Sequence, residues 1–493
     1  MNLLIGLSLL ALAEPAKLPA RGTPLIPVVT PNPSAEVLAA WRDASRLPAD
    51  QAKQTRYLSL YNVPVERRAE FVKVLNFHVN SLSREADLVR PRRITDSLLA
   101  IELDAYGWSA AAWDRLADAD PWFHAQVQAT VTGEKDQEFG YYVEGRWVTT
   151  RVAKVPTKEA KQQTVSAPWL PLMETYLLVA ATGSPAPIYR ADWFIDQTGQ
   201  QRGERGYYEF LGFAKLADAE SLAGLDRKGA AKSKKEVAAI VTDSGVTLNN
   251  RQIFRFGTVS GAWWETRDAN TSTAKRNAVR NLDGDFDFDA MEIYFTLPNG
   301  LFGLVLADKA GVLQAAAPDT IAADHVSTSN DRRVRIGVSC IRCHQEGLRP
   351  VQDWSRVVFR VGNETALGSP DREKARRLRQ LYLGQFQKAL TDDRTRYAET
   401  LNDFLGMKPD EISRQYAAAW RAYESDPILP ADAARELGCT EDELLAAIKG
   451  AAKTQGLSDL AFAGWLADPP QSMRREHFEE QAPVLFTLLQ QRK

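Results

Sequence analysis

The chain has 493 residues, of which 44% are hydrophobic and 25% are charged, and its formal net charge at pH 7 is −2. A chain of this length exceeds what one hydrophobic core organises, so two or three folded domains without extensive disorder are expected. The small net charge excludes a long-range attraction to nucleic acid or to an anionic membrane surface.

Residues 1–13 predict a secretory signal peptide. The apolar run over residues 3–13 is too short to span a bilayer, and Ala11-Leu12-Ala13 matches the small-residue pattern of a cleavage site. No Lys or Arg precedes this run, which leaves a buried N-terminal helix as the alternative. We expect a protein exported from the bacterial cytoplasm, periplasmic or secreted, that has no transmembrane anchor after the signal is removed.

Residues 14–166 predict an N-terminal domain that is mixed but mainly helical. Apolar spacing indicates helices from Ser34, at 65–82 and at 109–116, a buried strand at 97–104, and a hairpin over 140–155 that turns at Glu144-Gly145.

Residues 167–365 predict a β-rich central region, and residues 366–493 predict a helical region. Aromatic, β-prone stretches lie at 252–266 and 291–306, the second turning at Pro298-Asn299-Gly300, and a short helix is predicted at 232–242. One long helix is predicted at 371–404, with shorter helices at 410–423, 431–437, 440–454, 458–466 and 474–491. The predicted class is therefore α+β, with helical N-terminal and C-terminal parts around a mixed β-rich centre.

Two of the three cysteines form the sequence Cys340-Ile341-Arg342-Cys343-His344. This C-x-x-C-H pattern is the attachment motif of c-type haem. Its two-residue gap lets both sulfurs reach the vinyl groups on one porphyrin edge, and the adjacent histidine supplies the proximal iron ligand. In a chain with 3 cysteines and 5 histidines, about 2 chance matches are expected per 10,000 chains. The sequence therefore predicts one covalently bound haem c.

Three other interpretations of this motif stay open. A redox-active cysteine pair needs a βαβ setting, and the Gly and Pro residues within 345–350 disfavour the helix that it requires. A zinc site would add His325 to Cys340, Cys343 and His344. A surface disulfide would leave the histidine without a role. The predicted export favours haem, because haem c is attached outside the bacterial cytoplasm.

The sixth iron position separates electron carriage from catalysis. A Met or His ligand there gives a closed electron carrier, whereas an empty position binds small molecules. Met291, at the start of the predicted hairpin, and His325, shortly before the motif, are the candidate distal ligands. Met407, His78 and His124 have simpler explanations as packing or helix-end residues.

Side chains around the motif suit a haem pocket, although solvated loops and an ordinary sheet core explain them as well. Haem propionates need cationic partners. The candidates are Arg332, Arg333, Arg335, Arg342 and Arg349. Candidate aromatic walls are Trp263, Trp264, Tyr294, Phe295, Phe302 and Trp354.

Several segments occur in a characteristic order: LNFHVNSLSREADLVRPRRI, IELDAYGW, RADWF, LPNGLFGLVLADKAG and RVRIGVSCIRCHQEGL. In this order they resemble a family of large exported bacterial proteins that carry a single C-x-x-C-H motif after a Leu-Pro-Asn-Gly-Leu hairpin. The resemblance covers about residue 56 to the C-terminus and implies a secreted haem c protein, with no established activity. Many members carry a histidine shortly before the hairpin, where this chain has FDFDAMEIYF, which favours Met291.

A fainter similarity is to the cytochrome P460 class, whose motif lies late in a β-rich domain close to an Asp and a Val-Phe pair. Here Asp353 and Val358-Phe359 follow the motif. This similarity implies an open iron position and oxidation of small nitrogen compounds.

The sequence favours one-electron transfer outside the cytoplasm through one haem c, with an unidentified redox partner protein and no nucleic acid. Two alternatives remain. One is a haem enzyme with an open distal site, peroxidase-like or P460-like, and the other is a haem-based sensor or binding module whose helical regions dock a partner.

Overall fold

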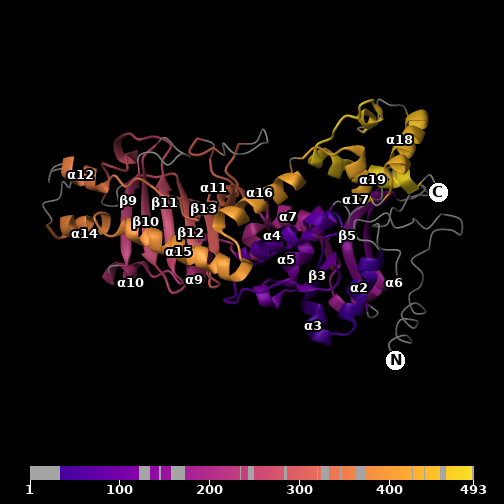
Figure 1. Ribbon diagram of the computed structural model, residues 1–493, viewed down its shortest axis with the longest axis horizontal. Coiled ribbons are helices and arrows are strands. Elements are labelled where there is room, and N and C mark those ends of the chain that lie inside the picture. The colour runs from indigo at the N-terminus through magenta and orange to yellow at the C-terminus, as the bar shows by residue number, and fades with distance from the viewer. Residues whose placement is uncertain are drawn as a thin grey trace.

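The computed structural model describes residues 34–120, 134–143, 146–156, 173–233, 235–241, 249–282, 286–318, 320–323, 332–344, 347–361, 372–424, 426–437, 439–455 and 462–490. A five-stranded sheet lies at one end of an elongated molecule and the C-terminal helices lie at the other (Figure 1). Helices in both terminal parts and a sheet-rich middle confirm the predicted α+β class. The predicted signal peptide, His124 and His325 lie outside the described residues.

The N-terminal part contains a four-stranded sheet of order β2-β3-β1-β6. Strand β1 (Thr55–Ser59), which is buried throughout, pairs antiparallel with β3 (Leu98–Glu102) and parallel with β6 (Ile188–Arg190). Strand β3 confirms the strand predicted at 97–104, and β6 brings residues beyond 166 into this sheet. The other elements of this part are β2 (Arg92–Arg93), α2 (Ser34–Ala44), α3 (Ala49–Gln54), α4 (Arg68–Ser81), α5 (Ala110–Arg115), α6 (Met173–Thr182), α7 (Ala191–Thr198), β7 (Gln201–Arg202), β8 (Arg205–Gly206) and α8 (Tyr207–Phe210). Helices α9 (Leu216–Ala223) and α10 (Arg227–Lys232) follow and lie beside the five-stranded sheet (Figure 1).

Local sequence signals explain several of these elements. Helix α5 begins after Ser109, whose Oγ accepts a hydrogen bond from the backbone N–H of Ala112 at 3.1 Å, as an N-cap does. Helix α4, together with a 3-10 turn at Val65–Arg67, confirms the helix predicted at 65–82. Strands β4 (Glu134–Val143) and β5 (Arg146–Pro156) form the predicted hairpin as an antiparallel pair.

The central region is a five-stranded antiparallel meander in which each strand pairs with its neighbours along the chain. Its strands are β9 (Glu236–Val241), β10 (Arg251–Gly257), β11 (Ala262–Asp268), β12 (Ala290–Thr296) and β13 (Phe302–Asp308). Strands β12 and β13 confirm the predicted hairpin. Its turn contains Gly300 with φ of +87°, a conformation that favours glycine.

Strand β9 shows that the short helix predicted at 232–242 is wrong. Val237, Ile240 and Val241 are β-branched, and pairing with β10 buries Ala238 to Val241. Strand β9 is also in contact with helix α14 (Arg372–Tyr382). Pairing and burial in the tertiary structure therefore outweigh the weak helical preference of this segment.

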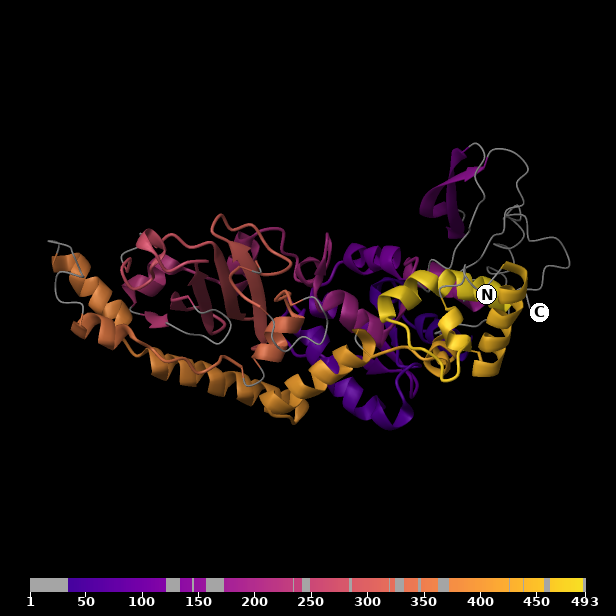
Figure 2. The same cartoon turned by 90° about the horizontal axis from the view of Figure 1, so that it is seen from above.

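The long helix predicted at 371–404 is divided into α14 and α15 (Phe386–Leu405). Gly384 lies between them, and a Cβ atom there would lie 3.0 Å from Val237 Cγ1 and 3.1 Å from the Gln380 carbonyl oxygen. The chain therefore turns at a close approach to β9, where a larger residue would require its neighbours to shift by a few tenths of an ångström. Helices α14, α15 and α16 (Pro409–Glu424) then run in succession along the molecule (Figure 2).

Three further helices form a separate small core at the C-terminal end. They are α17 (Pro430–Leu437), α18 (Glu441–Gln455) and α19 (Arg475–Gln490), and their core includes Leu437, Ile448, Trp465, Phe478 and Leu485. A 3-10 turn at Ala463–Leu466 covers part of the helix predicted at 458–466, whose beginning lies outside the described residues. In the described part of the chain, no helix has both the length and the apolar character needed to cross a membrane.

A buried ion cluster joins this C-terminal core to the N-terminal part. Glu436 on α17 accepts from Arg475 at 2.6 and 2.8 Å and from Arg190 of β6 at 2.8 Å. Burial alone would raise the pKa of Glu436, but Arg190 and Arg475 hold it at about 2. All three side chains are therefore charged and mutually paired.

Helix α15 is attached to the sheet by the buried carboxylate of Asp393. This carboxylate accepts from Arg255 Nε at 3.0 Å, from Arg255 Nη2 at 3.1 Å and from Trp264 Nε1 at 2.9 Å. Arg396 also donates to it at 3.3 Å, but its side chain is 50% exposed. Asp393 thus satisfies two buried donors that belong to two different strands.

Replacing Asp393 by Ala should lower the free energy of unfolding by about 3–5 kcal/mol, because it leaves the largely buried Arg255 without its counter-charge. Urea unfolding followed by tryptophan fluorescence measures the loss. The control Arg396→Gln removes an exposed partner of the same carboxylate and should cost less than about 1 kcal/mol. Equal effects of the two substitutions would contradict this account.

Candidate functional site

Helix α11 (Val338–Cys343) places the motif and begins at an unusually close backbone approach. Gly337 has φ of +76°, and a Cβ atom on it would lie 2.2 Å from the carbonyl oxygen of Gly199. The N–H of Val338 donates to that same carbonyl at 3.1 Å. Glycine at 337 therefore allows the helix to start directly against the end of α7, and its first turn carries Cys340 into the protein interior.

His344 follows α11 with its imidazole oriented by the backbone. Its Nδ1 lies 3.2 Å from the carbonyl oxygen of Gly347, which can only accept, so Nδ1 carries the proton. Burial lowers the pKa of His344 to about 3, so the ring is neutral at pH 7. A neutral ring protonated at Nδ1 leaves the lone pair of Nε2 available to a metal, and such a hydrogen bond commonly orients ligand histidines.

Tyr294 of β12 connects the histidine with the first cysteine. Its ring lies 4.1 Å from the imidazole of His344, centroid to centroid, at an interplanar angle of 32°. Its hydroxyl donates to Glu292 Oε1 at 3.1 Å and also interacts with the thiol of Cys340. Tyr294 was named from the sequence only as a possible wall of the pocket.

The two cysteines of the motif differ in exposure. Cys340 is buried, and burial raises the pKa of its thiol well above the ordinary value, whereas Cys343 is only partly buried. Neither of them forms a disulfide in this structure. A redox-active pair needs one cysteine with a lowered pKa, so the environment of Cys340 gives no support to thiol–disulfide exchange.

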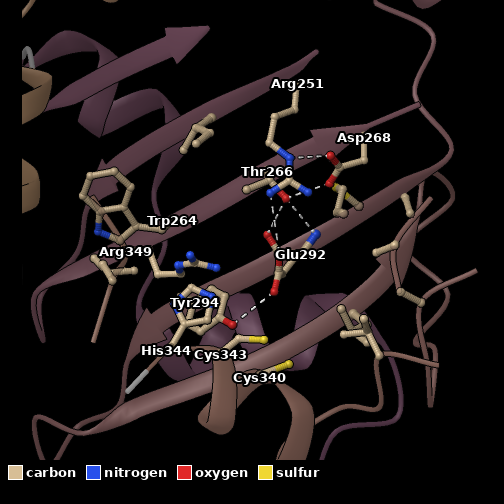
Figure 3. A pocket seen from close by; sticks show the side chains of 18 of the residues that line it. Arg251, Trp264, Thr266, Asp268, Glu292, Tyr294, Cys340, Cys343, His344 and Arg349 are labelled. Carbon is tan, nitrogen blue, oxygen red and sulfur yellow. Dashed lines mark hydrogen bonds and ion pairs between the residues drawn. The ribbon is translucent and has the colours of Figure 1, made fainter. Parts of the chain in front are cut away.

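Cys340, Cys343 and His344 all line one cavity of about 110 Å³ between the sheet, α11 and α15 (Figure 3). Its walls are mostly apolar, and they include Ile253, Trp264, Leu306, Val334, Leu348 and Phe386. Among the described residues, no three His, Cys, Asp or Glu side chains are arranged to hold a metal ion directly. The zinc interpretation also needs His325, which lies outside the described residues.

One end of this cavity is polar, because alternate residues of β10, β11 and β12 point into it. Arg251 Nε donates to Asp268 Oδ1 at 2.6 Å, and Thr266 Oγ1 donates to Asp268 Oδ2 at 3.0 Å (Figure 3). Arg251 Nη1 lies 3.8 Å from Glu292 Oε2. Burial is the main cause of the raised pKa of Asp268, and Arg251 opposes that rise. We call these four side chains the polar wall.

Met291 also borders the cavity, but strand alternation directs its side chain to the opposite face from Glu292 and Tyr294. The register pairs Met291 with Arg267 and Glu292 with Thr266. Its role as a distal iron ligand stays a prediction, and the register favours Glu292 and Tyr294 as the side chains that face the motif.

The other sequence candidates are placed as follows. Arg349 lines the cavity and is exposed, whereas Arg335 pairs with Glu424 at 2.5 Å, and Arg342 lies near Ser339 Oγ at 3.4 Å. Arg332 and Arg333 are exposed. Of the aromatic candidates, Trp264 and Tyr294 line the cavity. Trp263 and Phe295 stack on each other, and Phe302 stacks on Tyr397. The backbone N–H of Trp354 donates to the carbonyl oxygen of Ile240.

His78 and Met407 have the packing roles expected of them. His78 is buried and hydrogen-bonds to Tyr416 at 3.0 Å and to Thr198 at 2.7 Å, and burial lowers its pKa to about 3. Met407 is buried in the main core.

No sequence motif marks Arg251, Thr266, Asp268 or Glu292 as residues of a site. The only signal available was polar residues at alternate positions within otherwise aromatic strands, which is unusual for a buried sheet face. Because the four residues come from three strands, their meeting depends on the register between those strands.

No family model, curated protein or solved structure matches this chain.

The environment of the cysteines predicts their order of reactivity. In haem-free protein at pH 7.4, Cys340 should react with iodoacetamide at least about tenfold more slowly than Cys439, because its raised pKa and burial suppress the reactive thiolate. Mass spectrometry of the modified peptides measures the rates, and denatured protein should lose the difference. A fast-reacting Cys340 in the folded protein would contradict the described environment.

Proposed function

We propose that this chain is an exported c-type haem protein that transfers single electrons outside the cytoplasm. One haem would be bound by thioether links to Cys340 and Cys343, with His344 as the proximal iron ligand. The bound haem supplies a one-electron iron couple. The observation that carries the proposal is that both sulfurs and a histidine with a free Nε2 line the same apolar cavity.

The chemistry of the side chains fits covalent attachment. Attachment at Cys340 would add its thiol S–H across a vinyl group, with the S–C bond formed and the hydrogen moved to the other vinyl carbon. No external oxidant is needed. The exposed Arg349 is placed to pair with a propionate at the edge of the cavity.

The cavity is too small to hold a haem without a change in its walls. A cavity of about 110 Å³ is smaller than the roughly 300–1,000 Å³ of typical ligand sites. We therefore expect the side chains around it to move apart when haem is attached. Its inner lining of apolar side chains supplies the low-polarity surroundings that a porphyrin requires.

Three matched variants test the attachment. Protein from cells with a complete cytochrome maturation system should keep its porphyrin after acidic acetone extraction, with a mass increase on the peptide that contains residues 340–344. Cys340→Ala combined with Cys343→Ala should lose covalent haem, and His344→Ala should alter the haem spectrum. Cys439→Ala, which lies outside the cavity, should retain full haem content. Colourless wild-type protein would refute the proposal.

A second candidate function is a haem enzyme with an open distal position, and the polar wall favours it. A simple electron carrier needs no charged side chains in its haem cavity, and charge buried without a functional role is costly. Arg251 and Asp268 are both buried there, beside Glu292 and Tyr294.

Carbon monoxide binding separates the two candidates. With an open distal position, carbon monoxide should shift the Soret band of both the reduced wild-type protein and Met291→Leu, because the register turns Met291 away from the motif. If carbon monoxide leaves the Soret band of the wild-type protein unchanged but shifts that of Met291→Leu, Met291 is instead the distal ligand of a closed electron carrier.

A further inference from the structure

The polar wall contains a buried guanidinium group whose donors are mostly unused. The side chain of Arg251 is only 6% exposed, and Nε donates its hydrogen to Asp268. Among the described residues, the only other ionic partner is Glu292 Oε2, at 3.8 Å from Nη1. That separation is beyond hydrogen-bond distance. The terminal nitrogens therefore point toward the cavity without a direct acceptor (Figure 3).

Glu292 has a carboxylate oxygen whose capacity to accept a hydrogen bond is not used by Arg251. Its Oε1 accepts from the hydroxyl of Tyr294 at 3.1 Å, whereas within the described part of the chain Oε2 has only the distant contact with Arg251. Glu292 lines the cavity, and its side chain is 19% exposed. An unused donor and an unused acceptor thus face the same gap.

The buried ion cluster of the C-terminal part shows what a closed arrangement looks like in this protein. There, Glu436 lies 2.6–2.8 Å from the nitrogens of Arg190 and Arg475. Direct contact of this kind offsets the cost of burying charge. Arg251 is paired directly with Asp268 at 2.6 Å, but its 3.8 Å separation from Glu292 leaves hydrogen-bonding capacity that a bound polar group would use.

We propose that Arg251 and Glu292 form a binding subsite for a small ligand whose polar end both accepts and donates hydrogen bonds, such as a hydroxyl or hydroxamic acid group. An atom placed in the 3.8 Å gap reaches both side chains at ordinary hydrogen-bond distance. Arg251 donates to the ligand, and Glu292 accepts from it. Tyr294 and Asp268 position the two side chains.

The chemistry of the gap excludes simpler ligands. A carboxylate pairs with Arg251 but has no hydrogen to give to Glu292, and it meets repulsion there. An alkylammonium ion pairs with Glu292 but meets the positive charge of Arg251. The neighbouring Ile253, Leu306 and Phe386 suit a short apolar tail on the ligand. The subsite shares the cavity proposed for haem but does not require haem to be bound.

The test uses acetohydroxamic acid as the probe and the full-length protein as isolated. Isothermal titration should give a dissociation constant at least about tenfold lower for this probe than for acetate or methylammonium. Glu292→Gln and Arg251→Lys should each weaken probe binding at least about tenfold. Glu236→Gln, which makes the same change on the same sheet outside the cavity, should leave binding unchanged.

Further measurements keep the outcome decisive. Circular dichroism and the midpoint of thermal unfolding establish that each variant is folded, and if Arg251→Lys unfolds, Glu292→Gln alone decides. Equal probe affinity in wild type and Glu292→Gln, equal affinity for acetate, or no binding because only water fills the gap would each overturn the proposal.

A haem-free form separates this proposal from the proposed function. The variant with Cys340→Ala and Cys343→Ala should bind the probe as the isolated protein does. Binding that appears only in the haem-free variant would mean that bound haem blocks the gap, and this would also overturn the subsite. A wild-type protein without haem that still binds the probe would refute the haem proposal and leave the subsite intact.

Discussion

The close approach of Gly337 to Gly199 determines where the motif lies. No side chain larger than hydrogen fits at position 337, because its first carbon would lie 2.2 Å from the Gly199 carbonyl oxygen. Helix α11 therefore starts in direct contact with the end of α7. Thr198, the last residue of α7, hydrogen-bonds to His78 of α4. The N-terminal part thus sets the depth at which Cys340 and His344 enter the cavity, although the cavity walls come mainly from the central sheet.

Charge is buried in this protein in two different ways, and the contrast is informative. The cluster of Arg190, Glu436 and Arg475 is closed by direct hydrogen bonds and joins two parts of the molecule. The polar wall is incomplete, since Arg251 and Glu292 lie side by side without direct contact. Closed networks hold structure together, whereas an incomplete one beside a cavity has unused capacity for a ligand.

The strength of local signals explains which elements the sequence predicted correctly. The turn at Asn299-Gly300 and the helix at 109–116 depend on the conformations and hydrogen bonds of nearby residues, and both predictions were confirmed: Gly300 has a positive φ and Ser109 caps α5. The helix expected at 232–242 and the unbroken helix at 371–404 were wrong for a common reason. Strand β9 pairs with β10 and its Val237 also packs at Gly384, so each segment takes its form from contacts with another element.

The sequence by itself determined the chemistry of the candidate site. Two thiols and an imidazole at the spacing of Cys340, Cys343 and His344 are set by covalent order, which needs no knowledge of the fold. It also determined the α+β class, because hydrophobic periodicity changes along the chain.

Only the tertiary structure decided what surrounds that chemistry. The tautomer of His344 depends on the carbonyl of Gly347, which the local turn brings to it. Arg251, Asp268 and Glu292 meet because the register of three strands places them on one face. A shift of one residue in that register would turn Glu292 away and Met291 inward, since neighbouring residues of a strand face opposite sides. Such a register is set by the packing of the whole sheet, and no single segment of the sequence contains it.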